Sequence, residues 1–169
     1  ALQIPEVKAW TKRVRVPAVI SSERDSRGIT LVGVEPVSEV LLGFDNDSII
    51  EGRFLKDSND SGLIIGAKMA ERLETRLGKR VVIMSQDPDN NIADRGFRVV
   101  GIYKAKMASL EEIYVYAGLT TVQKLLNLEN RVSEIAITGG DYRHVKGWYP
   151  VIKKAAGENR QTLPWYEAN

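Results

Sequence analysis

The feature that most constrains this chain is a run of strand and helix patterns in the middle of the sequence. A buried-strand pattern at residues 63–65 is followed by Gly66 and by apolar residues spaced three and four apart, which predicts a helix with one apolar face. These apolar residues are Met69, Ala70, Leu73 and Leu77. Gly78 follows, and glycine ends helices readily because it tolerates a left-handed backbone. Further strands are predicted at residues 81–83 and 97–103, and nothing in this run is arranged for catalysis.

Shorter patterns precede this run. Residues 14–21 and 29–34 alternate as strands do, and the polar segment 22–28 between them predicts a hairpin. Residues 36–42 predict a short helix with three apolar residues on one side. These are Val37, Val40 and Leu41. The segment 45–62 is rich in Asp, Asn and Gly, and we place a subdomain boundary there.

The second half of the sequence continues the alternation. Strands are predicted at residues 113–116 and 132–138, and a helix at 119–128 with Thr120 or Thr121 as its cap. A further helix is predicted at 149–156, and a last short strand at 162–165. The helices are too few and too short to cover both faces of a parallel sheet, so the fold class is α+β.

Composition excludes several classes of function. The chain of 169 residues has no cysteine, which excludes disulfide scaffolds, zinc–thiolate sites and thiol nucleophiles. Its net charge is only +2, without the basic excess typical of nucleic-acid binders, so we expect no nucleic-acid partner. No apolar stretch is long enough to span a membrane. The first residue is not Met, so we expect these residues to come from a longer protein.

No motif for cofactor or metal chemistry is complete. Neither a phosphate-binding loop nor the GxGxxG dinucleotide pattern is present, and we expect no cofactor. The single histidine, His144, lies in a polar segment and is interpreted as an exposed loop residue. Residues 57–62 match the first half of a calcium loop, but Lys68 stands where a bidentate Glu is required. Residues 87–95 lack the loop glycine. We interpret both as ordinary polar turns and expect no metal site.

Two further groups of residues were considered as functional. Glu111 and Glu112 could serve a hydrolase, but in a strand they would point to opposite faces, which favours surface carboxylates. Four aromatic residues near the C-terminal end are interpreted as capping the core. They are Trp148, Tyr149, Trp165 and Tyr166. Alternatively, Trp165 and Tyr166 would lie at a membrane interface if a span followed Asn169.

Taken in order, these segments resemble a known family. The resemblance rests on the run at residues 63–103, on Gly33-Val34-Glu35-Pro36 as a "G-V/I-x-P" element, and on the strands and helix at 113–137. It extends to residues 162–169, which resemble a "W-x-x-x-N" run that enters a membrane helix. The chain is similar over its whole length to the extracytoplasmic core of MacB/FtsX-type ABC transporter permeases. Among the branches, the lipoprotein-releasing (LolC/LolE-like) one is the most similar, and a MacB-like export branch or an uncharacterised branch is the alternative.

The resemblance implies a fold, a location and partners. The fold would be two-lobed, with a porter-like βαβ lobe from residues 1–50 and 111–169 and an inserted smaller β-rich lobe from 51–110. The chain would lie on the periplasmic face of the bacterial inner membrane. The permease would pair with a second permease subunit, as a homodimer or a heterodimer, and with a cytoplasmic ATPase. ATP would then be hydrolysed on another chain, so this chain would be no enzyme and would transmit movement for lipoprotein release or export.

A periplasmic carrier or adaptor protein is a further implied partner. In the relative that recruits a carrier, a protruding hairpin with prolines grasps it. Residues 87–95 are short and contain only Pro88, so carrier binding is not transferred to this loop. We expect partner contacts at Met107 and Leu110, because methionine adapts to binding surfaces, and at Asp89 and Arg95. Core packing of Met107 and Leu110 is the alternative for that pair. The alternative function is a stand-alone periplasmic module that binds a small molecule or peptide in a concave apolar pocket.

Overall fold

The structure, a computed structural model, describes residues 7–164 and residue 167. The chain divides into two compact units. The larger unit is Thr11–Ala136, and the smaller combines Ala1–Trp10 with Ile137–Asn169. The two boundaries predicted from the sequence, near residues 50 and 110, both lie inside the larger unit.

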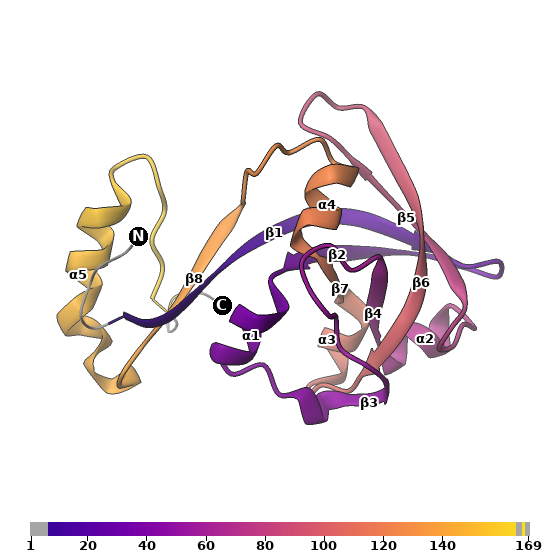
Figure 1. The fold of residues 1–169 in the computed structure, drawn as a ribbon, viewed down its shortest axis with the longest axis horizontal. Coiled ribbons are helices and arrows are strands. Elements are labelled where there is room, and N and C mark those ends of the chain that lie inside the picture. The colour runs from indigo at the N-terminus through magenta and orange to yellow at the C-terminus, as the bar shows by residue number, and fades with distance from the viewer. Residues whose placement is uncertain (1–6, 165–166, 168–169) are drawn as a thin grey trace. The chain divides into compact units, whose positions relative to one another are not determined.

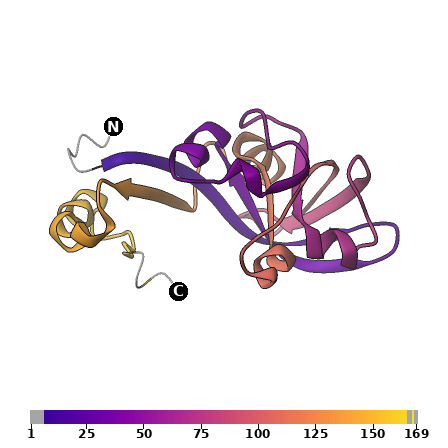
Figure 2. The ribbon, with the colours of Figure 1, turned by 90° about the horizontal axis from the view of Figure 1, so that it is seen from below.

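Six strands close into a ring (Figures 1 and 2). In order around the ring they are β1 (Val7–Ser21), β2 (Ser26–Val34), β7 (Tyr114–Gly118), β4 (Gly62–Gly66), β6 (Ile92–Tyr103) and β5 (Arg80–Gln86), which returns to β1. The pairs β2–β7 and β4–β6 are parallel, and the other pairs are antiparallel. The predicted α+β class is therefore confirmed, as a mixed sheet with a barrel-like closure.

Strand β1 pairs with one ring neighbour over a long stretch and with the other over a short one, and we call such a pairing of two ring strands a seam. The β1–β2 hairpin runs from Arg13 paired with Val34 to Ser21 paired with Ser26, as its sequence pattern predicts. In contrast, β1 pairs with β5 through only three residues, from Val19 opposite Met84 to Ser21 opposite Val82. The half-ring β1, β2 and β7 comes from the predicted porter-like range, and the half-ring β4, β5 and β6 from the predicted inserted range. A two-lobed division along this line stays a prediction.

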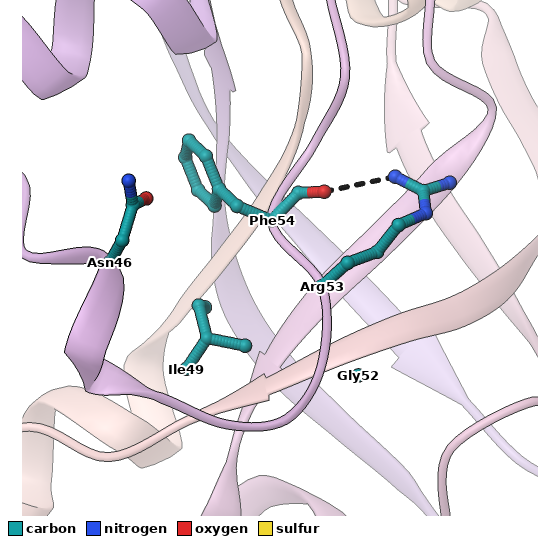
Figure 3. Close-up of a pocket in the computed structure, with 5 residues that line it drawn as sticks. All are labelled: Asn46, Ile49, Gly52, Arg53 and Phe54. Carbon is teal, nitrogen blue, oxygen red and sulfur yellow. Dashed lines mark hydrogen bonds between the residues drawn. The ribbon is translucent and has the colours of Figure 1, made fainter.

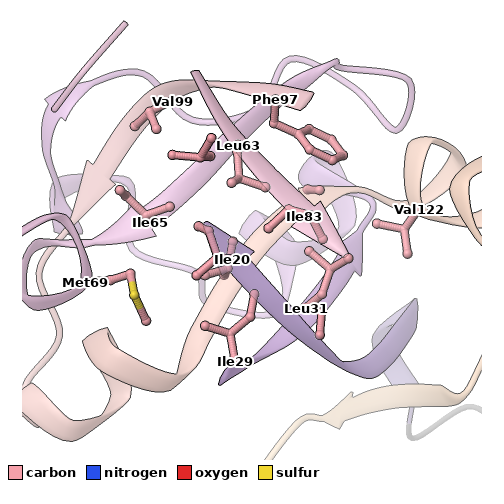
Figure 4. Packing of buried hydrophobic residues seen from close by; sticks show 14 of the residues in the cluster. Ile20, Ile29, Leu31, Leu63, Ile65, Met69, Ile83, Phe97, Val99 and Val122 are labelled. Atoms are coloured by element: carbon pink, nitrogen blue, oxygen red, sulfur yellow. The ribbon is translucent and has the colours of Figure 1, made fainter. Parts of the chain in front are cut away.

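The interior of the ring holds the main hydrophobic core (Figure 4). Alternate residues of the strands point inward, as the period of two requires, and Ile20, Leu31 and Phe97 are almost fully buried. Two helices complete this core, α2 (Ala67–Arg72) with Met69 and α4 (Leu119–Leu125) with Val122.

A second core lies on the outer face of the sheet. It contains Val32, Ile64 and Tyr103, which neighbouring strands direct outward. The segment with η1 (Asn46–Ser48) and β3 (Ile49–Gly52) contributes Ile49 to this core, and β3 pairs with β6. The ring of Phe44 stacks on that of Phe54, with centroids 4.3 Å apart.

Helix α2 is shorter than its apolar periodicity predicts. It ends at Arg72, and Glu74 then adopts a left-handed conformation with φ of 47°. The backbone N–H of Thr75 donates to the carbonyl of Ala70, which closes the helix end. Leu77 therefore lies outside the helix and is 38% exposed, so its predicted place on the buried face was wrong.

The remaining elements are α1 (Pro36–Leu41), α3 (Ala108–Ile113) and β8 (Glu134–Gly139), with η2 (Tyr142–His144) and α5 (Val145–Ala156) in the smaller unit. Of these, α1, α5 and β8 differ from the predictions at their ends, whereas α3 and η2 were not predicted. Neither predicted threonine caps α4, because Gly118 is its N-cap residue and the Thr121 hydroxyl donates to the carbonyl of Asp60 at 3.0 Å. Residues 161–164 form no strand, and Trp165 and Tyr166 lie outside the described residues.

Candidate interaction surfaces

Met107 and Leu110 lie on one exposed stripe of α3. Met107 is the N-cap residue of this helix and is 62% exposed, and Leu110 is 36% exposed. Ile113, three residues further along the same helix, is also exposed. Neither Met107 nor Leu110 is among the buried core residues. We call Met107, Leu110 and Ile113 the α3 surface.

The opposite side of α3 is fixed by a buried carboxylate. Glu111 is 2% exposed, and its two oxygens accept hydrogen bonds from the backbone N–H groups of Lys68 (3.2 Å) and Ala105 (2.9 Å). Lys68 is in the first turn of α2, and the N-cap residue of that helix, Gly66, has no side chain that could accept a hydrogen bond. Glu111 therefore satisfies a free donor of another helix, and the expectation that it is a surface carboxylate on a strand was wrong.

Asp89 and Arg95 lie in and beside the loop between β5 and β6. Asp89 is exposed in this loop, which Asp87 organises by accepting bonds from the backbone N–H groups of Asp89 and Asn91, both at 2.9 Å. Hydrogen bonding from the Asn91 side chain, and then from its backbone, lowers the pKa of Asp87. Arg95 is partly buried on β6, with its guanidinium carbon 5.3 Å from the centre of the Phe97 ring.

The four predicted contact residues form two separate surfaces. From Arg95 to the end of β6 at Tyr103 there are eight residue steps, which is about 26 Å at the usual rise of a strand. Met107 and Leu110 come after that end. A single partner patch would have to span this distance, and the binding role of either pair stays a prediction.

Helix α1 carries an exposed apolar surface that the sequence pattern did not identify as such. Its three apolar residues do share one side, but that side faces solvent. Val37 is 71% exposed, Leu41 is 69% exposed and Val40 is 42% exposed. The residues that α1 buries are Pro36 and Glu39.

The buried carboxylate of Glu39 is stabilised by Arg13, whose guanidinium donates a hydrogen bond to each of its two oxygens. The Nε–Oε1 distance is 2.6 Å and the Nη2–Oε2 distance is 2.7 Å. Hydrogen bonding to Glu39 raises the pKa of Arg13 against the opposing effect of burial. Arg13 also donates to Glu134 at 3.1 Å. Arg13 pairs with Val34 in the β1–β2 ladder, and Val34 comes shortly before α1. The predicted first strand began at residue 14, so beginning it one residue earlier would have placed Arg13 beside the start of α1.

A shallow hollow of about 330 Å³ lies at β3 and the segment after it (Figure 3). It is lined by Asn46, Ile49, Gly52, Arg53 and Phe54. The Arg53 guanidinium donates to Asp60 at 2.6 Å and to the carbonyl of Phe54 at 2.9 Å, so its charge is already paired. The lining mixes polar and apolar groups and differs from the concave apolar pocket that the binding-module alternative predicts.

The other residues considered for chemistry have structural partners. Glu112 forms an ion pair with Arg72 at 3.2 Å. His144 is exposed, as predicted, and its Nδ1 lies 3.2 Å from Asp141. Within residues 7–164 and 167, no cluster of His, Asp or Glu side chains could hold a metal ion, and no helix is sufficiently long and apolar to cross a membrane.

The polar segment at residues 57–62 is a turn, as predicted. Asp57 accepts a hydrogen bond from the backbone N–H of Asn59 at 2.7 Å, and Asp60 accepts one from Gly62 at 2.8 Å. Burial opposes ionisation of Asp60, but hydrogen bonds from Arg53 and from two backbone N–H groups outweigh it and lower the pKa of this carboxyl.

Comparison with known proteins supports one family. The family model described as the MacB-like periplasmic core domain matches residues 1–147. No curated protein matches the chain.

Two solved structures share its fold. The extracellular domain of the noncanonical ABC-type transporter YknZ from Gram-positive bacteria has a TM-score of 0.63 at 19% identity, over 86% of this chain and 72% of that one. The periplasmic region of MacB from Actinobacillus actinomycetemcomitans has a TM-score of 0.62 at 16% identity, over 92% and 71% of the two chains.

Proposed function

Because the chain belongs to the MacB-like periplasmic core domain family, we propose that it transmits movement generated by a separate ATPase to the outer side of the membrane. It is the periplasmic or extracellular domain of a membrane ABC transporter permease, and domains of this family are not catalytic. The observation that carries the proposal is this family match over residues 1–147.

The closed ring supports a mechanical role. Close-packed protein interiors have low compressibility and transmit strain, whereas loosely joined segments absorb it. Here the interior of the ring is filled by residues that are almost fully buried, such as Leu63 and Phe97, and two helices complete the packing. We therefore expect the packed ring to move as one body when force is applied to it.

The partners and the branch belong to the same proposal. We assign the chain a second permease subunit, identical or different, a cytoplasmic ATPase and a carrier or adaptor protein outside the membrane. We assign its activity to lipoprotein release or export, in the LolC/LolE-like branch. The α3 surface supports a protein partner, because an exposed methionine adapts to such contacts and exposed apolar residues accompany it.

The two predicted lobes have a counterpart in the ring. Residues 51–110 supply the half-ring β4, β5 and β6, the flanking ranges supply the other half, and β3 lies across the predicted boundary. We propose that the porter-like and inserted lobes correspond to these half-rings.

Distance measurements on the full-length permease test the mechanical role. The chain has no cysteine of its own, so within this domain spin labels attach only to the cysteines that are introduced. One variant carries Val37→Cys in each permease subunit and reports the distance between the two domains. A second carries Val37→Cys and Ile92→Cys in one subunit and reports a distance within one domain. Both side chains are about 70% exposed, so labelling leaves the core intact.

The permease and its ATPase are reconstituted in nanodiscs and measured by pulsed electron spectroscopy with ADP and with a non-hydrolysable ATP analogue. We expect the distance between domains to change with the nucleotide and the distance within a domain to stay constant. An inter-domain distance that is the same with both nucleotides would contradict the proposal. A distance within one domain that changes as much as the inter-domain distance would also contradict it.

A further inference from the structure

Two arginines face each other across the β5–β6 ladder. Arg80 and Arg98 are register partners, and both side chains are exposed. Their side chains share the outer face of the ring, since the adjacent residues Val81 and Phe97 point into the core. Like charges that are directly opposite destabilise a sheet, so this pair costs stability unless an anion lies between them.

Neither arginine has an anionic partner among the described residues. Arg98 donates from Nη1 to the carbonyl of Gly78 at 2.6 Å, which fixes its position without neutralising its charge. Asp94 lies on the same face of β6, but no ion pair within 4.0 Å joins it to either arginine in the described part of the chain. Two positive charges therefore remain available on this face.

The arginines line a hollow of about 260 Å³ beside β6. Its lining is Ser61, Arg80, Gly96, Phe97 and Arg98. A Cβ atom on Gly96 would lie 2.3 Å from Nε and 2.4 Å from Nη2 of Arg80. The glycine therefore allows the Arg80 guanidinium to lie flat against the neighbouring strand, at the edge of the hollow.

We propose that this hollow binds a phosphate-type oxyanion. The planar guanidinium presents several donors in a fork that matches phosphate oxygens, and charge-assisted hydrogen bonds of this kind are among the strongest in proteins. Ser61 also lines the hollow, and serine carries a hydroxyl that can donate to a phosphate oxygen. The anion is either free phosphate or the headgroup of a phospholipid, since both present the same oxygens.

Titration of the chain with inorganic phosphate, against chloride at equal ionic strength, tests the site. Isothermal titration calorimetry gives the affinity, and thermal melts confirm that each variant is folded. We expect Arg80→Gln and Arg98→Gln each to weaken binding about tenfold or more, as the loss of a charged hydrogen bond does. Arg131→Gln is the matched control, because it removes the same charge from an exposed arginine outside the hollow, and it should leave the affinity unchanged.

The variant Gly96→Ala tests whether phosphate binding depends on the shape of the hollow or only on its positive charge. This variant keeps both positive charges but displaces the end of the flexible Arg80 side chain, so the sheet should still fold. We expect it to weaken phosphate binding severalfold. Equal losses in Arg80→Gln and Arg131→Gln, no loss in Gly96→Ala, or no binding by the unaltered chain would each overturn the proposal.

Vesicles distinguish the two sources of the anion. Sedimentation is compared for phosphatidylglycerol vesicles and for phosphatidylcholine vesicles. Phosphate binding with retention on phosphatidylglycerol vesicles that Arg80→Gln abolishes would support the site and identify a lipid headgroup. Phosphate binding without such retention would support the site and identify free phosphate.

Discussion

At the scale of single residues, Glu39 has the least expected position, because a carboxylate is buried while three apolar neighbours on its helix are exposed. Burying a charge is costly unless a partner and hydrogen bonds compensate it. Arg13 provides both in the form of two short bonds. The pair therefore holds α1 against the ring, and holds it with its apolar side outward.

Replacing Arg13 should be more harmful than replacing the whole pair. Arg13→Met leaves the Glu39 carboxylate buried without its partner, and we expect a loss of about 3 kcal/mol in the free energy of unfolding. The double variant Arg13→Met with Glu39→Met removes the uncompensated charge as well, so it should be more stable than the single variant. Urea unfolding followed by circular dichroism measures both. A double variant less stable than Arg13→Met would contradict this account.

Asp60 makes the stability depend on pH in a defined direction. Its pKa in the folded chain is below the ordinary value of 3.8, so folding favours the ionised form. The resulting stabilisation is fully present above pH 3.8 and is lost as the pH falls through the folded-state pKa. Asp60→Asn should therefore lower the free energy of unfolding by about 2 kcal/mol at pH 7, and the difference from the unaltered chain should shrink below pH 3.8.

Urea unfolding at a series of pH values between 7 and about 2.5 measures this dependence. Asp89→Asn is the control, because that carboxylate is exposed in the loop after β5 and forms no side-chain hydrogen bond or ion pair within the described part of the chain. It should change stability little at any pH. A constant difference between Asp60→Asn and the unaltered chain across the series would show that ionisation of Asp60 is not the cause.

At the scale of elements, the early end of α2 predicts different costs for two leucines on the same apolar pattern. Leu73 is fully buried, whereas Leu77 is 38% exposed beyond the helix. Leu73→Ala should cost about 3 kcal/mol, as truncations in a packed core do, and Leu77→Ala should cost about 1 kcal/mol or less. Chemical unfolding of the two variants provides the comparison. Equal costs would indicate that the helix extends to Leu77 after all.

Local patterns predicted most elements of the larger unit. The β1–β2 hairpin, the order β4, α2, β5, β6 and the pair β7, α4 follow from alternation, helical spacing and glycine positions. Closure of the ring did not follow, because the β1–β5 and β4–β7 seams join residues far apart in sequence and leave no local signal.

The helices that carry the surfaces were harder to predict. Helix α3 has a side fixed by Glu111, whose partner Lys68 is 43 residues away, so its sequence alone showed neither the helix nor the buried carboxylate. In α1 the apolar side was predicted, but its exposure depends on Arg13, which is 26 residues from Glu39. Met107 and Leu110 were predicted as contact residues because methionine adapts to binding surfaces, whereas their separation from Asp89 and Arg95 followed only from the length of β6.

At the scale of the whole molecule, a permease whose ring moves as one body should function with that ring locked. Val19 and Met84 are register partners on the short β1–β5 seam, and both are exposed. Val19→Cys with Met84→Cys should form a disulfide and raise the stability of the chain by about 2 to 4 kcal/mol, because it closes a long loop. Non-reducing electrophoresis and thermal melts check this step.

The same pair is then placed in the full-length permease with its ATPase. If the ring does not open during the cycle, transport coupled to ATP hydrolysis should be unchanged between the oxidised and the reduced protein. Each single cysteine variant controls for the substitution itself. Transport that stops on oxidation and recovers on reduction would show that the seam opens as part of the mechanism.

The closed ring also bears on how such domains tolerate crowding. Each of its six strands has hydrogen-bonded neighbours on two sides. Exposed strand edges are templates onto which other chains add, and natural sheets avoid aggregation by removing or covering them. Anchoring to a bilayer confines many copies to a thin layer, where encounters are frequent. Among the six ring strands, closure leaves fewer unpaired edges at which colliding copies could add to one another.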